Sequence, residues 1–225
     1  MDLQNRIRDI QKRIEDAAAR SGRAPSSVKL LAVTKTFPVE TLRAAYDLGL
    51  REFGENRVQE ALGKIPQLPS DIRWHLIGQL QTNKINKILR QFVLIQSIDS
   101  LELAQAFSKR LGDRTQEILL EVNTSGEASK SGVQPEEALA ATLAIAALPG
   151  LKLTGLMTVG PLTDNQNEQR DAFKKLKVVF EQIRTKANAD TFSILSMGMS
   201  GDFEMAIEEG ATLVRVGSAL FGSRA

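Results

Sequence analysis

A lysine that follows a short apolar run is the first residue in the chain with a clear capacity for chemistry. Lys35 comes directly after residues 30–34 (LLAVT), and the chain then breaks at residues 36–38 (TFP). An amine held at the rim of a core can be desolvated, which lowers its pKa and makes it a nucleophile toward carbonyl carbons. We therefore consider Lys35 a candidate imine-forming residue, the alternative being an ordinary lysine at the end of a strand.

Two glycine-containing stretches near the end of the sequence could bind an anion. Residues 196–201 (SMGMSG) lead into a predicted helix, with Ser200 as a candidate N-cap, and Gly217-Ser218 follow the last predicted strand. Backbone amides exposed in such loops suit a phosphate group. The alternative is a pair of ordinary turns, one of them carrying a helix cap.

Arg215 interrupts the apolar strand predicted at residues 213–216 (LVRV). Strand alternation places it on the same face as Leu213 and Gly217. A charge buried in a strand is costly unless it meets an acceptor or an anion. Arg215 should therefore either form a salt bridge at the rim with an Asp or Glu or direct its guanidinium at a ligand.

Two further polar residues have simpler explanations. Asn56 follows a predicted strand and could cap the helix that begins near Arg57, and His75 lies within a strand between apolar neighbours. The residues themselves favour a capping role for Asn56 and a structural, hydrogen-bonded role for His75 over a role as general base.

The elements that must position these residues alternate regularly along the chain. Short apolar runs, each followed by a helical pattern, predict parallel strands covered by helices. About eight such units in 225 residues indicate a single α/β domain, residues 1–225, folded as a (β/α)8 barrel with an extra N-terminal helix. An open doubly wound sheet is the alternative, although no Gly-x-Gly-x-x-Gly loop follows the first strand. The predicted strands cover residues 30–33, 51–53, 74–77, 92–95, 118–122, 151–157, 192–195 and 213–216.

In such a barrel, chemistry lies at the carboxyl ends of the strands, which brings Lys35 close to the two candidate anion loops and to Arg215. An amine, an anion site and a guanidinium suit two kinds of ligand. One is the phosphorylated carbonyl substrate of a lysine-dependent aldolase, and the other is pyridoxal 5′-phosphate (PLP). Spacing alone does not choose between them.

Composition restricts the remaining possibilities. The formal net charge of +2 gives no reason to propose a nucleic acid or a membrane as partner. The absence of cysteine excludes disulfides and thiolate sites, and a single histidine excludes a metal site built on two histidines. The charged, amphipathic start of the chain resembles neither a signal peptide nor a spanning helix, so we expect a cytoplasmic protein.

Several long motifs, in order from end to end, resemble the pyridoxal phosphate homeostasis protein family. These motifs are AVTKTFP around Lys35, FGENRVQE around Asn56, WHLIGQLQTNK at 74–84, GLM at 155–157, SMGMSGDFEMAI at 196–207 and VRVGSALFG at 214–222. The resemblance implies a barrel like the N-terminal domain of alanine racemase, the type III fold of PLP enzymes, without the C-terminal β domain.

The resemblance also implies roles for individual residues. Lys35 would form the internal aldimine with PLP, and Arg215 would face the pyridine nitrogen, with Asn56 near the ring substituents. Phosphate would be held by the residues Ser200, Gly217 and Ser218 and by the amide of Met199, with Ser196 lining the pocket.

The implied function is homeostasis of PLP (vitamin B6) and of amino and keto acids, without catalysis. A guanidinium at the pyridine nitrogen weakens the ring as an electron sink, and we expect no second domain to supply a base or to exclude water. A PLP-dependent racemase is the alternative. Expected partners are PLP itself and PLP-accepting apoenzymes or small amino acids, and we expect a monomer.

Overall fold

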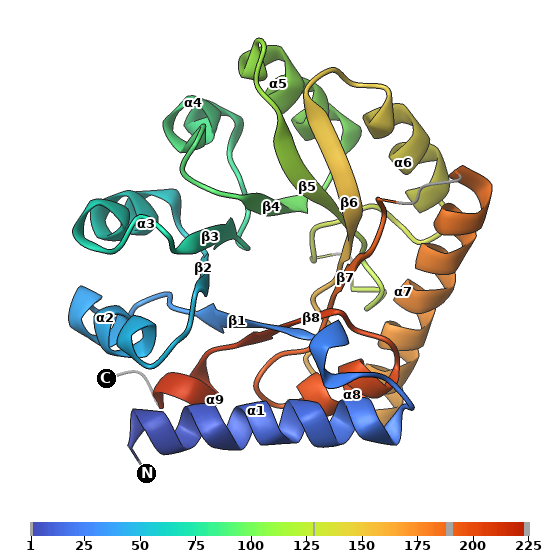
Figure 1. Cartoon of the computed structure of the whole chain (residues 1–225). Helices are drawn as coiled ribbons and strands as arrows, with labels where there is room; N and C mark the ends of the chain where they lie inside the picture. Colours follow the sequence, from blue (N-terminus) through green and yellow to red (C-terminus); the bar gives the residue numbers. More distant parts are fainter. Residues whose placement is uncertain (1, 128, 188–190, 223–225) are drawn as a thin grey trace.

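The protein folds as a closed barrel of eight parallel strands surrounded by helices (Figure 1). The computed structural model describes residues 2–127, 129–187 and 191–222. The strands follow one another around the barrel in chain order, and β8 closes the ring by pairing with β1. This confirms the predicted (β/α)8 barrel and excludes the open doubly wound sheet. The strands are β1 Lys29–Val33, β2 Glu52–Glu55, β3 Arg73–Leu76, β4 Leu94–Ile98, β5 Gln116–Glu121, β6 Leu151–Met157, β7 Ile194–Ser196 and β8 Leu213–Val216.

Helices follow the strands and form the outer layer of the molecule. The α-helices are α1 Leu3–Arg20, α2 Val39–Asp47, α3 Val58–Lys64, α4 Ile85–Ile88, α5 Leu101–Leu111, α6 Ala138–Ala146, α7 Gln166–Ala187, α8 Phe203–Glu208 and α9 Ser218–Phe221. Short 3-10 turns cover Pro25–Ser27, Ile65–Gln67 and Thr82–Lys84. Within the part of the chain that the structure describes, no helix combines the length and apolar character needed to cross a bilayer.

Most of the strands form because they contain short apolar runs that can be buried on both faces, whereas β2 carries a glutamate at each end. Side chains on the outer faces of the strands pack against the helices and form the larger hydrophobic core. The barrel interior contains a smaller apolar cluster, made of Leu31, Leu94, Leu119, Met157 and Leu213. Polar side chains occupy other interior positions, and these positions form the candidate site described below.

The extra N-terminal helix α1 lies along the outside of the barrel against α8 and α9 (Figure 1). Its apolar stripe, which includes Ile7, Ile10 and Ile14, is buried in this contact, as helical periodicity predicts. Arg13 forms an ion pair with Glu204 of α8 at 2.8 Å. The helix therefore covers the part of the barrel whose carboxyl end carries the two candidate anion loops.

Several strand bounds differ from the predicted ones, and the fourth strand is displaced furthest. The strand expected at 92–95 is β4, Leu94–Ile98, so Phe92 precedes it and packs into the core. Gln96 and Ser97 lie in this strand and are buried. These two polar residues interrupt the apolar pattern, so the strand was predicted to end before them. They can be buried within the strand because the barrel interior supplies hydrogen-bond partners, which a sequence pattern does not reveal.

Candidate functional site

The predicted site residues lie on one arc of the barrel, at the carboxyl ends of β7, β8, β1 and β2. Lys35 follows β1, and Asn56 follows β2 directly. Ser196 ends β7, and Met199 and Ser200 lie in the loop that follows. Arg215 lies in β8, Gly217 follows that strand and Ser218 begins α9. Because β8 pairs with both β7 and β1, and β1 pairs with β2, these four segments are neighbours in space. The structure thus brings together all eight residues predicted from the sequence.

The backbone on both sides of Lys35 is anchored to neighbouring elements. The side chain of Thr34 is fully buried and donates hydrogen bonds to Glu55 Oε1 at 2.6 Å and to the carbonyl of Gly54 at 3.2 Å. Thr36 has a positive φ of 70°, which is uncommon for a β-branched residue. Its amide donates to Glu60 Oε1 at 2.5 Å. Lys35, which is half-buried, therefore extends from a constrained turn.

A buried ammonium group holds this turn in place from outside the barrel. Lys64, on α3, donates to Glu55 Oε1 at 2.8 Å, Glu60 Oε1 at 2.6 Å and the Thr34 carbonyl at 2.8 Å. Burial raises the pKa of Glu55, although Lys64 and Thr34 act in the opposite direction. The sequence analysis missed this network, and its only local signal is the i,i+4 spacing of Glu60 and Lys64.

The two candidate anion loops are joined through Ser200. Its hydroxyl oxygen accepts hydrogen bonds from the amides of Gly217 and Ala219, each at 3.2 Å. The expectation that Ser200 caps α8 is wrong, because the N-cap position of that helix is Asp202. Asp202 instead accepts a hydrogen bond from the amide of Met199. Several backbone donors therefore converge where the loops after β7 and β8 meet.

Two glycines allow this close approach of the loops. Gly198 has a φ of +88°, and a Cβ at this position would lie 2.5 Å from the Cβ of Ala206. A Cβ on Gly217 would lie 3.2 Å from the carbonyl oxygen of Val33. Any larger residue would push α8 away from the loop at the first position, and at the second the Val33 carbonyl would have to move by a few tenths of an ångström.

Arg215 is a buried cation whose described hydrogen-bond acceptors are all neutral. Its side chain donates through Nη1 to Ser196 Oγ and through Nη2 to the carbonyl of Thr158, both at 2.6 Å. Burial lowers its pKa to about 10, while the charges of Asp202 and Glu121 oppose this shift. No salt bridge to Arg215 occurs among the described residues, so the expected alternative of a rim ion pair is wrong. At neutral pH the guanidinium remains charged beside the anion loops.

Glu121, at the end of β5, is a second ionisable group that the sequence analysis missed. It is buried, and burial raises its pKa to about 7, with the charge of Asp99 adding to the shift and Arg215 opposing it. This carboxyl group can therefore change its charge near neutral pH. The signal in the sequence is a charged residue in a predicted apolar strand, which is also the signal that identified Arg215.

Of Asn56 and His75, for which simple structural roles were expected, only His75 has the expected role. Asn56 is not the cap of α3, since the N-cap residue is Arg57 and no side-chain capping bond forms. Instead the backbone of Asn56 lies against Gly78, where a Cβ would come within 2.3 Å of the Asn56 carbonyl oxygen. His75 is buried with hydrogen bonds at both ring nitrogens, which confirms the structural role expected for it.

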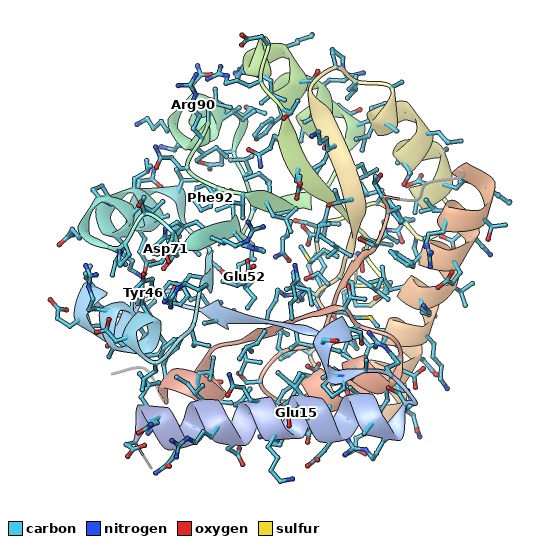
Figure 2. The ribbon with its side chains drawn as sticks, in the orientation of Figure 1. Glu15, Tyr46, Glu52, Asp71, Arg90 and Phe92 are labelled. Carbon is cyan, nitrogen blue, oxygen red and sulfur yellow. The ribbon has the colours of Figure 1, made fainter. Side chains whose placement is uncertain are left out.

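The one tyrosine of the chain has its hydroxyl group engaged elsewhere. Tyr46, on α2, donates a hydrogen bond from Oη to Asp71 at 2.7 Å, and Arg51 lies over its ring. The side chains of Tyr46 and Asp71 lie close together beside α2 in Figure 2. Tyr46 therefore does not belong to the arc of residues that contains Lys35 and Arg215.

Comparison with known proteins agrees with this geometry. The family model of the alanine racemase N-terminal domain matches residues 6–225. A pyridoxal phosphate homeostasis protein of Pseudomonas aeruginosa is 45% identical over 221 residues, covering 97% of this chain and 94% of its own length. A protein of the same name from Aquifex aeolicus is 43% identical over 227 residues, covering 100% of this chain and 99% of its own. The chain belongs to the pyridoxal phosphate homeostasis protein family.

Solved structures support both the family and the fold. PipY of Synechococcus elongatus, in a structure with PLP bound, is similar with a TM-score of 0.82 and 35% identity, covering 98% of this chain and all of the other. An alanine racemase of Clostridium difficile has a TM-score of 0.75 at 17% identity, covering 99% of this chain and 56% of its own. The second likeness concerns the fold alone, and it confirms the expected similarity to the barrel of alanine racemase.

Proposed function

We propose that this protein is a PLP-binding protein of PLP, amino-acid and keto-acid homeostasis, which holds its cofactor reversibly through Lys35. The observation that carries the proposal is the combination found on one arc of the barrel. Backbone amides converge on Ser200 between the loops after β7 and β8, and a buried guanidinium, Arg215, lies in the strand between Ser196 and Lys35. The relatives named above carry the same function in their names.

The donors at the two loops fit the phosphate group of PLP. The amides of Gly217 and Ala219 both donate to the Ser200 hydroxyl oxygen, so the hydroxyl hydrogen of Ser200 can be donated to an anion bound beside the two loops. We assign the phosphate to Ser200, Gly217 and Ser218, with the amide of Met199 as a further donor. Ser196, fully buried beside Arg215, lines the same pocket.

Arg215 fits the pyridine end of the cofactor. A guanidinium has donors only, and at a pKa of about 10 it keeps its charge at neutral pH. Beside the ring nitrogen this charge disfavours protonation of the ring. We place Asn56 near the ring substituents, because it follows β2, the strand that pairs with β1.

PLP supplies an aldehyde that reacts with amines and a ring that can accept electrons. The chain supplies Lys35 to bind the aldehyde carbon, and the anchored Thr34 and Thr36 keep its backbone in place. A lysine on a constrained turn loses less conformational freedom when it binds, which favours retention of the cofactor.

We propose that turnover is low or absent. Arg215 weakens the ring as an electron sink, and Tyr46, the one tyrosine that could act as a base, is bonded to Asp71. The function that remains is to bind a reactive aldehyde and release it again. We further propose a cytoplasmic monomer, a single domain whose partners are PLP-accepting apoenzymes or small amino acids. Cell fractionation and light scattering test the location and the oligomeric state.

Absorbance spectroscopy of the purified protein tests the binding proposal. We expect a PLP absorption band that is lost in Lys35→Ala and is retained in Lys29→Ala, a lysine at the opposite end of the same strand. Borohydride reduction followed by peptide mass spectrometry should place one PLP on Lys35. A colourless protein that does not take up added PLP would contradict the proposal and would favour a cofactor-free aldolase.

A separate assay tests the absence of catalysis. The PLP-loaded protein is incubated with a panel of L-amino acids, and racemisation and decarboxylation are followed by chiral chromatography. We expect rates close to those of free PLP. Sustained turnover that depends on Lys35 would instead establish a racemase-like enzyme.

A further inference from the structure

A line of hydrogen bonds runs from Arg215 into the interior of the barrel. Arg215 Nη1 donates to Ser196 Oγ at 2.6 Å, and Ser196 Oγ donates to Gln96 Oε1 at 2.7 Å. This step takes the line from β8 through β7 to β4, on the other side of the barrel.

The line continues toward the amino-terminal ends of the strands. Gln96 Nε2 lies 2.9 Å from His75 Nδ1, and His75 Nε2 lies 2.6 Å from Glu52 Oε2. Arg73 donates to the other carboxylate oxygen of Glu52 at 2.9 Å. Figure 2 shows Glu52 near β2, and its side chain contributes to a cavity of about 260 Å³ at this end of the barrel.

The members of this line are shielded from water. Ser196 and Gln96 are 0% exposed, and His75 and Arg215 are 4% exposed. Barrel interiors are normally filled by bulky apolar side chains, so a buried polar line is a departure that is tolerated only when each group finds its partner. A function for the line would explain why apolar packing has not replaced it.

The chemistry of the two ends determines the direction of every hydrogen bond between them. Arg215 can only donate and an ionised Glu52 can only accept. Burial opposes the ionisation of Glu52, but the hydrogen bond from His75 and the charge of Arg73 outweigh it and lower the pKa. Ser196 therefore donates to Gln96, and Gln96 presents its amide N–H to His75. His75 must then carry its proton on Nε2, the nitrogen that faces Glu52.

We propose that Gln96 and His75 are positioning residues for Arg215, which hold the guanidinium through Ser196 and couple the cofactor site to the Glu52 end of the barrel. This inference rests on the proposed function, because PLP binding is what places a cofactor beside Arg215. The line holds the Ser196 hydroxyl with its lone pairs toward Arg215. Loss of Gln96 frees that hydroxyl to rotate, and the guanidinium loses one of its two neutral acceptors.

The first test uses the cofactor-free protein. His75 is the one histidine of the sequence, so its ring nitrogens can be observed by NMR without overlap. We expect the proton on Nε2 in the wild type, where Glu52 accepts it, and a shift of the Nδ1 resonance in Ser196→Ala, a change two hydrogen bonds away from the ring. An Nδ1 resonance that stays unchanged in Ser196→Ala would overturn the proposal. This result does not depend on PLP binding.

The second test measures PLP binding in a matched pair of variants. Gln96→Leu removes a member of the line, whereas Gln116→Leu removes a buried glutamine that is bonded to the carbonyls of Phe92, Val93 and Glu117. We expect Gln96→Leu to weaken PLP affinity about tenfold and to shift its absorption maximum, and Gln116→Leu to change the affinity less than about twofold.

These measurements separate a positioning role from a general loss of stability. Equal affinities and equal absorption maxima in Gln96→Leu and Gln116→Leu would overturn the proposal. If the wild type itself does not bind PLP, the proposed function fails, while the NMR result still stands. If Gln96→Leu does not fold, His75→Gln takes its place, with the same expected shift in absorption and loss of affinity.

Discussion

The amide of Gly217, directly after β8, donates a hydrogen bond to the hydroxyl oxygen of Ser200 in the β7–α8 loop at 3.2 Å. Ala219 donates to the same oxygen. One side chain therefore holds two loops together at the point where backbone donors converge. Ser200 is the residue at which cofactor binding and loop structure can be separated by experiment.

Replacing Ser200 by Ala should weaken PLP binding by about tenfold, because one hydroxyl donor to the phosphate is lost. Affinity for pyridoxal, which lacks the phosphate, should change far less. Titrations of both ligands with both proteins form a cycle that isolates the phosphate contact. Equal losses for the two ligands would mean that Ser200 acts only on the structure of the loops.

Replacing Arg215 by Met should separate the stability of the empty barrel from the retention of its cofactor. The guanidinium is buried and has no carboxylate partner among the described residues, so an apolar side chain of similar length should leave the free energy of unfolding unchanged or raise it. PLP should bind more weakly and with a shifted absorption maximum. Urea unfolding of the cofactor-free proteins and PLP titration provide the two measurements. A Met variant that loses stability equally with and without PLP would contradict this expectation.

Glu121 should make the stability of the protein depend on pH. Burial raises its pKa from 4.5 to about 7. Between these pH values the unfolded chain releases a proton that the folded protein keeps, so this group's stabilising contribution is present below pH 4.5 and is lost as the pH rises through 7. The change should amount to at most about 3 kcal/mol.

The variant Glu121→Gln isolates this contribution. The difference in unfolding free energy between the variant and the wild type, measured by urea titration at several pH values, should shift in favour of the variant as the pH rises through this range. Other groups cancel in the difference. A difference that does not vary with pH would show that Glu121 titrates near its ordinary value in the folded protein.

In the ion network beside the Lys35 turn, replacing Lys64 alone should lower the free energy of unfolding more than replacing Lys64 and Glu55 together. Lys64→Met leaves Glu55 buried without a cation and should destabilise the protein by about 3–5 kcal/mol. The double variant Lys64→Met/Glu55→Gln should recover much of this loss, because no unpaired charge remains at Glu55. Unfolding free energies of the single and double variants give the coupling directly.

An exposed ion pair serves as the control for this experiment. Lys12 and Asp16 are paired on the surface of α1 at 3.1 Å, with side chains 74% and 51% exposed. Lys12→Met should therefore change stability by less than about 1 kcal/mol. If Lys64→Met were as mild as Lys12→Met, the buried network would not support the Lys35 turn.

The fold and the main site residues could be predicted from local patterns. Apolar runs that alternate with helical periodicity predict a parallel barrel, and a barrel places all strand ends on one face. Lys35 was singled out because it is a charge at the edge of an apolar run, and Arg215 because it is a charge within one. Ser200 was found for an incorrect reason, since it joins two loops and does not cap α8.

Spacing along the chain is enough to predict about eight strands, their order and the strand ends at which polar residues gather. Only the tertiary structure decided which polar groups meet inside the barrel. The contact from Ser196 to Gln96 spans 100 positions and that from Arg215 to Thr158 spans 57. Such contacts depend on strand register and on barrel closure, and no local pattern of residues encodes either of them.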